Sequence, residues 1–369
     1  MTAVIEIVNL HKAYGDLRVL QGLNLRVVAG EAFGLLGPNG SGKSTLIHLM
    51  LGFLRPTSGQ IRVLGSTNLE RTRPRIGYIP ERQRYHTRYT AREYLRFLGA
   101  FSGMTGRALR ERVADELETV GLTAVADRGL ATFSKGMLQR LGVAQALLTD
   151  PDLLLIDEPT SGLDPAGQRE VLEVLHQVRV RGHTVLLCTH HLHEVERLCD
   201  RVGVLAGGQI AAEATVADLR GTATSLHISV SPLPLATRAH IEALDPSVRC
   251  DPQSIRISAN TPALQAAVLR ALLDTDAQIL ALEPIERPLD QFYRQAVRGE
   301  LAPPPPLPPL APIVAPPPPP PPPPPEPPPV VEPSPALPWA ALLAPAEPKS
   351  GEGDTLLNEL LKQKQDGEA

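Results

Sequence analysis

The sequence predicts an α/β fold for about its first 220 residues, built around a buried and mostly parallel β-sheet. Short apolar runs of strand length recur there, each beside a turn or a stretch with helical periodicity. Strands that are apolar on both faces are typical of parallel sheets covered by helices on both sides. The runs that predict these strands are AFGLLG (32–37), IGYI (76–79), LLLID (153–157) and TVLLCT (184–189).

Length, charge and cysteine content set the broad class of the protein. The 369 residues suffice for two or three domains. Because 36 basic residues nearly balance 40 acidic ones, the composition gives no case for a nucleic-acid binder. Cys188, Cys199 and Cys250 are too few for a disulfide scaffold, which fits a reducing compartment. We expect neither a signal peptide nor a membrane span, since no apolar run reaches ~18 residues.

A smaller unit is predicted over residues 225–299. Its elements follow the order β-α-β-β-α-β and then a helix, which resembles the split βαβ arrangement of a small α+β domain. The segments that predict it are SLHISV (225–230), TRAHIEAL (237–244), VRC (248–250), SIRIS (254–258), PALQAAVLRALL (262–273), QILAL (278–282) and PLDQFYRQAV (288–297).

The C-terminal part of the chain is rich in proline. Of 39 prolines, 25 lie in residues 302–348, and proline removes backbone donors and fixes φ, so this segment is predicted to be a disordered, extended linker. Leucines at helical spacing then predict a short amphipathic helix over 354–364. Two interpretations stay open: the tail recruits a partner through this helix, or it is a solvated extension.

A phosphate-binding loop is predicted after the first buried strand. Its glycines let backbone amides turn toward phosphate, Lys43 reaches the outer phosphates and Ser44 offers an oxygen to Mg²⁺. The loop precedes a helical pattern, which is the context that this motif needs. Its residues are Gly37, Pro38, Asn39, Gly40, Ser41, Gly42, Lys43, Ser44 and Thr45.

A second anchor for the metal is predicted at the end of the strand LLLID. Asp157 stands at the carboxyl end of that strand, where open α/β sheets bind their ligands. Glu158 follows at once and is well placed to polarise an attacking water. The alternative is that both carboxylates only cap a helix or a turn before Pro159.

Three further motifs follow in order: FSKGMLQ (133–139), SGLD (161–164) and CTHHLHEVERLCDRV (188–202). With the phosphate loop and the aspartate strand, they resemble the ATP-binding subunits of ABC transporters over residues 4–220. The resemblance implies a P-loop NTPase fold, an ABC ATP-binding domain with a helical subdomain. It also implies ATP and Mg²⁺ as cofactors.

The resemblance assigns roles to individual residues. The catalytic ones are Glu158, His190 and Lys43, with His190 contacting the γ-phosphate. Mg²⁺ is assigned to Ser44, Asp157 and Glu81. Besides the phosphate loop, the nucleotide is contacted by Tyr14, which stacks on adenine. Ser134, Gly136 and Gln139 of the signature face the ATP of a partner subunit, and Asp164 belongs to the loop that links the two sites.

Several of these residues could have a purely structural role instead. Tyr14 could instead be a half-buried tyrosine near a turn, and Asp164 could be the start of a helix. His190, His191 and His193 could form a His-rich turn or a zinc cluster, but no cysteine or further histidine completes a convincing set. Glu81 stands where most family members have glutamine, so it could be an exposed loop residue.

An arginine-rich segment interleaved with tyrosines lies on both sides of Glu81. In the resembling family this region leads into the helical subdomain that grips the membrane subunit. We expect these arginines to meet an acidic coupling helix or inner-leaflet phosphates; a solvated basic face is an equal alternative, and nucleic-acid binding a lesser one. They are Arg71, Arg73, Arg75, Arg82, Arg84, Arg88, Arg92 and Arg96, with Tyr85, Tyr89 and Tyr94 among them.

Glu81 and the SKGM form of the signature resemble the ABC-2 exporter branch. The function implied is an ATP-hydrolysing subunit that energises export through a separate ABC-2 type membrane permease, by ATP-driven head-to-tail dimerisation with itself or a paralogue. The chain would then be cytoplasmic and peripheral on the inner face of the cell membrane, without a nucleic-acid partner. The alternative is a non-transport ABC-type ATPase of DNA repair, chromosome structure or translation.

Overall fold

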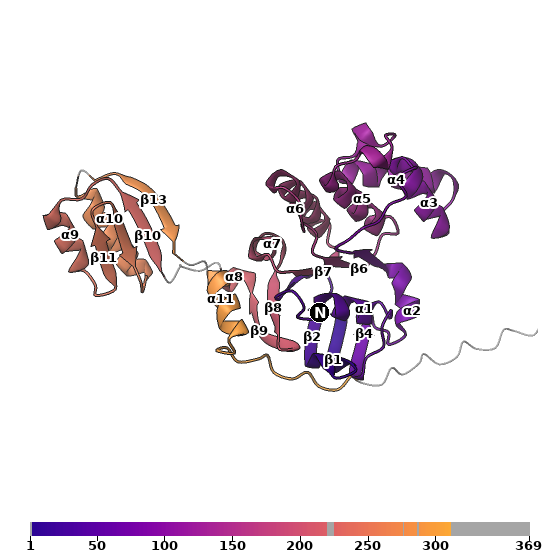
Figure 1. Ribbon diagram of the computed structural model, residues 1–369, viewed down its shortest axis with the longest axis horizontal. Coiled ribbons are helices and arrows are strands. Elements are labelled where there is room, and N and C mark those ends of the chain that lie inside the picture. Colours follow the sequence, from indigo (N-terminus) through magenta and orange to yellow (C-terminus); the bar gives the residue numbers. More distant parts are fainter. Residues whose placement is uncertain (1, 220–224, 276, 286–287, 311–369) are drawn as a thin grey trace, which may run out of the picture. The chain divides into compact units, whose positions relative to one another are not determined.

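The computed structural model describes residues 2–219, 225–275, 277–285 and 288–310. Figure 1 labels its elements. Up to residue 219 they are β1 (Ala3–Tyr14), β2 (Leu17–Val28), β3 (Ala32–Leu36), α1 (Lys43–Met50), β4 (Ser58–Val63), α2 (Leu69–Thr72), β5 (Ile76–Ile79), α3 (Ala91–Phe101), α4 (Gly106–Thr119), α5 (Lys135–Leu147), β6 (Leu153–Asp157), α6 (Pro165–Val180), β7 (Thr184–Thr189), α7 (Leu192–Leu198), β8 (Arg201–Ala206), β9 (Gln209–Thr215) and α8 (Val216–Leu219).

A six-stranded sheet in the order β5-β6-β7-β3-β8-β9 forms the centre of this part. Its strands pair in parallel except for the β8–β9 pair, which is antiparallel. The four strands predicted from apolar runs are β3, β5, β6 and β7, so the prediction of a buried parallel sheet is confirmed. β3, β6 and β7 are buried at every position.

Alternate residues of these strands enter two different hydrophobic cores, because successive side chains of a strand point to opposite faces. In β6, Leu154 and Ile156 pack with the apolar sides of α5, α6 and α7. Leu153 and Leu155 pack with α1 and with the three-stranded antiparallel sheet β2-β1-β4. The parallel strands are therefore covered on both sides, which accounts for their uniformly apolar sequences.

The arm between β5 and α5 consists mainly of α3 and α4. The capping box at the start of α3 consists of Thr90 and Glu93, which bond to each other's backbone N–H groups. α4 and α5 contribute to the same core as the sheet through Val113, Leu117 and Leu141. This is the small helical subdomain that the family resemblance implies.

The elements after residue 225 are β10 (Leu226–Val230), α9 (Leu235–Glu242), β11 (Val248–Asp251), β12 (Ser254–Ile257), α10 (Pro262–Leu273), β13 (Ile279–Pro284) and α11 (Pro288–Val297). β10–β13 form an antiparallel sheet in the order β11-β12-β10-β13. Its buried residues pack against α9 and α10 in a separate core. This element order agrees with the predicted split βαβ arrangement.

The last helix differs from the sequence prediction, which grouped it with the small α+β unit. α11 buries Leu289 and Ala296 in the core that also holds Val195 of α7 and Val202 of β8. The physical reason is that the apolar stripe of α11 packs against α7, α8, β8 and β9. We therefore place residues 288–297 with the ATPase part of the chain.

Residues 301–310, here called the strap, also depart from the predicted free linker. Leu301 packs against the same core as α11. Pro304, Pro305 and Leu307 line a cavity of about 390 Å³ together with residues of β2, β8 and β9. The backbone N–H of Leu310 donates to Gln60 Oε1 of β4 at 3.2 Å. Polyproline geometry suits such a surface, because it leaves few backbone donors to satisfy.

The remainder of the predicted proline-rich linker and the predicted helix at 354–364 lie outside the described residues. Within the ranges that the structure does describe, no helix combines the length and the apolar character needed to cross a membrane.

The strap predicts a difference between two truncated chains. A chain ending at Glu300 loses the half-buried Leu301 and Leu307, which together contribute about 2 kcal/mol to the free energy of unfolding. A chain ending at Leu310 keeps them. We expect the melting temperature of the shorter chain to be lower by about 4 °C, with ATPase activity retained in both. Differential scanning calorimetry gives the comparison, and equal melting temperatures would contradict a packed strap.

Candidate nucleotide-binding site

The predicted phosphate loop connects β3 to α1. Gly40 and Gly42 adopt φ of +82° and +106°, conformations that side-chain-bearing residues rarely accept. At Gly37 an added Cβ would lie 2.6 Å from Ser41 Oγ and 2.8 Å from the Leu205 carbonyl oxygen. Glycine is thus required here by conformation and by close packing, and the loop amides precede the N-terminus of a helix, where anions bind.

Lys43 connects the loop to the neighbouring strands. Its ammonium donates to the carbonyl oxygens of Gly37 at 2.8 Å and Pro38 at 3.3 Å. It also forms an ion pair with Glu158 Oε1 at 3.2 Å, and both side chains are more than nine-tenths buried. The Lys43 ammonium therefore lies between the phosphate loop and Glu158, the carboxylate that is predicted to polarise water.

Asp157 lies at the end of β6 and is almost fully buried. Burial raises the pKa of its carboxyl group, while a hydrogen bond from the Ser44 hydroxyl works in the opposite direction. Its Oδ1 atom has no hydrogen-bond partner among the described residues. An orphaned carboxylate oxygen beside a serine hydroxyl is a donor set that suits a hard divalent cation, so these residues fit the predicted Mg²⁺.

Glu158 takes an unusual backbone conformation, with φ of +47°. Its N–H donates to the carbonyl oxygen of Cys188 at 2.9 Å, which extends the pairing of β6 with β7 by one residue. Oε2 then accepts from Thr189 Oγ1 at 3.3 Å and pairs with His190 Nδ1 at 2.8 Å. A strained backbone held by such contacts is typical of functional positions.

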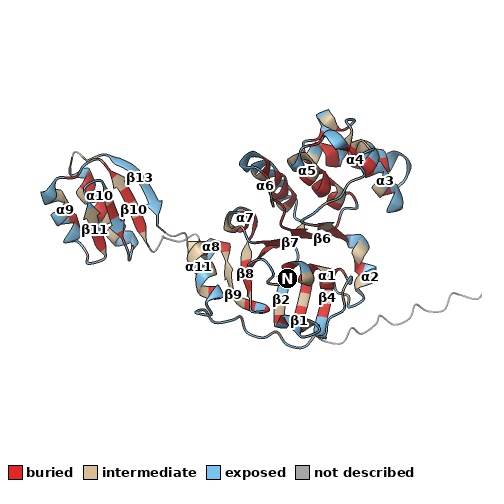
Figure 2. Ribbon diagram, viewed as in Figure 1, coloured by how far each residue is buried: buried red, intermediate tan, exposed pale blue. Residues whose placement is uncertain are grey.

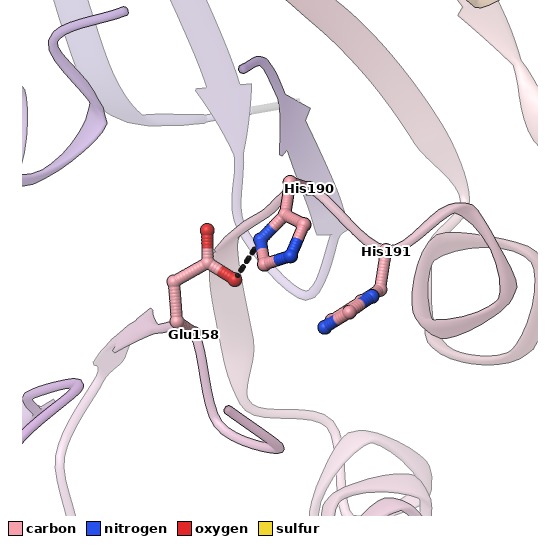
Figure 3. Close-up of side chains that lie close together, drawn as sticks. All are labelled: Glu158, His190 and His191. Atoms are coloured by element: carbon pink, nitrogen blue, oxygen red, sulfur yellow. Dashed lines mark hydrogen bonds and ion pairs between the residues drawn. The ribbon is translucent and has the colours of Figure 1, made fainter. Parts of the chain in front are cut away.

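Two histidines face Glu158, as Figure 3 shows. The ring centroids of His190 and His191 are 3.9 Å apart. His191 is the N-cap residue that precedes α7, and its N–H donates to Thr189 Oγ1 at 3.0 Å. The pKa of His191 is lowered, mainly by burial and secondly by the electrostatic effect of the neighbouring His190. His193 lies one step further on, with its ring centroid 5.5 Å from that of His191.

A cavity of about 370 Å³ gathers half of the predicted site residues. It brings the phosphate loop together with Glu81, Glu158 and His190, although these groups come from four separate segments of the chain. Val19 and Ser161 also line it: the sequence does not predict Val19, and it indicates Ser161 only as part of the SGLD motif. The full lining is Val19, Asn39, Gly40, Gly42, Lys43, Ser44, Thr45, Glu81, Glu158, Ser161 and His190.

Tyr14 and the signature residues are not in this lining. Tyr14 ends β1 with 46% of its surface exposed and with the Lys12 ammonium 4.7 Å from its ring centroid. Ser134 caps α5 by accepting from the Met137 N–H at 3.2 Å. Asp164 caps α6 through the Gly167 N–H. In a single chain these residues serve as an exposed ring and as helix caps.

Lys135 and Gln139 show how the signature segment is held. The Lys135 ammonium donates to the Ser161 carbonyl oxygen at 2.7 Å and so ties the signature segment to the SGLD loop of the same chain. An added Cβ at Gly136 would lie 3.6 Å from Gly167 Cα, which is an ordinary van der Waals contact, so packing against α6 does not by itself require glycine here. Gln139 is 7% exposed, and its Nε2 has no hydrogen-bond partner among the described residues.

Comparison with known proteins agrees with this geometry. Residues 20–161 match the ABC transporter family. The chain is 39% identical over 229 residues to the linearmycin resistance ATP-binding protein LnrL of Bacillus subtilis (strain 168), across 60% of this chain and 74% of that protein. The chain belongs to the family of ABC transporter ATP-binding proteins.

Two further similarities extend this assignment. The chain is 42% identical over 215 residues to the Nod factor export ATP-binding protein I of Rhizobium meliloti (strain 1021), across 58% of this chain and 64% of that protein. A solved structure described as a dimeric post-hydrolysis state of the ATP-binding cassette MJ0796 with ADP and Pi is 27% identical, with a TM-score of 0.53, and covers 59% of this chain and 100% of that chain. This family comprises the ATP-hydrolysing subunits of transporters.

Replacing Glu158 with glutamine gives a direct test of the ABC site. The amide keeps the size of the side chain but cannot accept a proton from water, so we expect the steady-state rate of ATP hydrolysis to fall by ~10²–10⁴-fold while ATP binding persists. Phosphate release and binding of a fluorescent ATP analogue measure the two effects. Glu118→Gln, on the exposed side of α4, is the matched control and should leave the rate unchanged.

Proposed function

We propose that this ABC protein is the ATP-hydrolysing subunit of an exporter whose channel is a separate ABC-2 type membrane permease. The observation that carries the proposal is the cavity in which the phosphate loop, Glu158 and His190 meet. The printed names of two relatives refer to Nod factor export and linearmycin resistance, which supports export as the direction of transport.

In the proposed reaction Glu158 polarises the water that attacks the γ-phosphate, and His190 keeps its carboxylate in place through the 2.8 Å contact. Lys43 is now paired with Glu158, and arriving phosphates would compete for its ammonium. That exchange frees one carboxylate oxygen at the time that the substrate binds. Mg²⁺, which Ser44, Asp157 and Glu81 would hold, supplies charge neutralisation on the phosphates.

Two chains are proposed to close head-to-tail over two ATP molecules. The start of α5, with Ser134 and Gly136, does not line the cavity of its own chain, although the positive N-terminal end of this helix suits a phosphate. A second copy, or a paralogue with the same signature, would bring such a helix to the open side of the ATP. The hydrogen bond from Lys135 to Ser161 would then couple the two ATP sites. It joins the signature segment, which faces the ATP of the partner, to the loop that lines the cavity of its own chain.

The permease is proposed to dock on the arm of α3 and α4. A groove of about 940 Å³ runs beside it, lined among others by Tyr78, Leu98 and Met104. Phe101, at the end of α3, is 86% exposed, and Figure 2 shows the exposed face of this helix in pale blue. A large aromatic ring in water at the rim of an apolar groove is typical of an interaction surface.

The arginine-rich segment divides into internal and external members. Arg73 donates to the carbonyl oxygens of Leu51 and Gly52, and Arg75 and Arg92 form ion pairs with nearby aspartates. Tyr85, Tyr89 and Tyr94 pack against the hydrophobic core. Arg82 also pairs with an acidic side chain, Glu81, at 4.0 Å, but 90% of its own side chain is exposed. Arg71, Arg84, Arg88 and Arg96 are exposed as well. Among the exposed arginines we propose that Arg82 and Arg84, which lie nearest to Glu81 in the sequence, meet acidic groups on the permease or lipid phosphates.

Membrane co-purification tests the partner. The Glu158→Gln chain, which holds ATP, should bring a multi-span protein out of a detergent extract, as identified by mass spectrometry. Adding Arg82→Glu and Arg84→Glu should reduce that recovery at least tenfold, because the charge of both exposed side chains is reversed, while ATP binding is unchanged. Arg169→Glu, on the exposed surface of α6, is the control for charge alone. Recovery of soluble partners, nucleic acid or ribosomes in place of a permease would favour the non-transport ATPase.

A further inference from the structure

The histidine pair beside Glu158 offers a second use of this site. We propose that Glu158, His190 and His191 form a binding site for a borderline divalent cation such as Zn²⁺, separate from the Mg²⁺ position at Ser44 and Asp157, and that its occupation blocks hydrolysis. The site itself stands on the geometry alone. The inhibitory consequence rests on the role proposed above for Glu158.

The donor atoms already converge. One ligand atom from each of the three side chains lies within 4.8 Å of the other two, and Figure 3 shows both rings turned toward the carboxylate. Tetrahedral zinc with bonds of ~2.0–2.2 Å places its donors about 3.4 Å apart. Small rotations of the two imidazoles would bring the three donor atoms to this spacing. The cation would take the place of the proton in the 2.8 Å contact between Glu158 Oε2 and His190 Nδ1.

The chemistry of the donor set fits zinc rather than magnesium. Two imidazoles and one carboxylate, with a fourth position open to solvent, are a common set for Zn²⁺ in proteins. Mg²⁺ prefers oxygen ligands, which are found at Ser44 and Asp157 instead. From the sequence the histidines lack a completing ligand. The fold supplies it, because Glu158 comes from β6 and the histidines follow β7, the strand paired with it.

The surroundings of the three ligands support the site and also limit it. Glu158 is 7% exposed and accepts from Thr189 Oγ1, so its carboxylate is oriented by a second contact. The His190 side chain is 38% exposed, which leaves an entry path for an ion. The ammonium of Lys43 on Glu158 Oε1 opposes a further positive charge. Binding is therefore expected at Oε2.

Zn²⁺ and ATP should exclude each other, because both draw on His190 and Glu158. In the proposed reaction Glu158 faces the water while His190 holds its carboxylate, and the family resemblance implies that His190 also contacts the γ-phosphate. A bound cation would instead coordinate both side chains. Coupling between two ligands is reciprocal, so ATP should weaken Zn²⁺ binding by the same factor as Zn²⁺ weakens ATP binding. His191 separates the two functions, since it has no part in the proposed hydrolysis.

The test is titration of the nucleotide-free, untagged full chain with Zn²⁺ alone, by isothermal calorimetry. We expect one site per chain, and His191→Gln should weaken it tenfold or more. His193→Gln is the matched control, one step along the same turn, and should bind as the wild type does. Circular dichroism and ATP binding show that both variants are folded. Absence of Zn²⁺ binding, or a larger loss with His193→Gln than with His191→Gln, would overturn the site.

A second readout separates the site from the proposed function. Micromolar Zn²⁺ should inhibit ATP hydrolysis by the wild type and by His193→Gln, and His191→Gln should need at least tenfold more. Equal inhibition of all three chains would mean that Zn²⁺ acts by replacing Mg²⁺ on ATP, which contradicts the inhibitory role. A chain without ATPase activity that still bound Zn²⁺ through His191 would refute the proposed function and support the metal site.

Discussion

The register between three parallel strands is the constraint on which the nucleotide site depends. Leu36 of β3 pairs with Thr189 of β7, and Asp157 of β6 pairs with Cys188. The residues that follow these strands therefore emerge side by side: the phosphate loop, Glu158 and His190. Because both faces of the strands are buried, a slip of one residue would send apolar side chains into the wrong core, so the register is strongly specified.

Much of this was predictable from sequence, for a physical reason. A parallel strand buried on both faces must be apolar throughout, and a loop that binds phosphate with backbone amides must contain glycine at certain positions. The strands at 32–37 and 153–157 and the loop glycines Gly37, Gly40 and Gly42 carry those two signals. The order of elements from 225 to 284 was likewise readable, because short alternating strands and an apolar helix have distinct periods.

Other features depend on contacts between distant segments, which periodicity does not reveal. The sequence of α11 predicts an amphipathic helix. The surface that this helix covers is formed by β8 and β9 only once the chain has folded. The tie from Lys135 to Ser161 needs two loops to meet. The set of Glu158, His190 and His191 joins residues over thirty positions apart. Val19 carries no chemical signal that would have marked it as part of the cavity lining.

In the proposed dimer, one chain holds an incomplete ATP site that a second α5 completes. Sedimentation velocity of the Glu158→Gln chain, with and without MgATP, tests this arrangement. We expect a monomer without nucleotide, a dimer with MgATP, and a monomer in both conditions once Ser134→Arg places a bulky cation at the start of α5. A MgATP-dependent dimer that formed equally well with Ser134→Arg would contradict the head-to-tail arrangement.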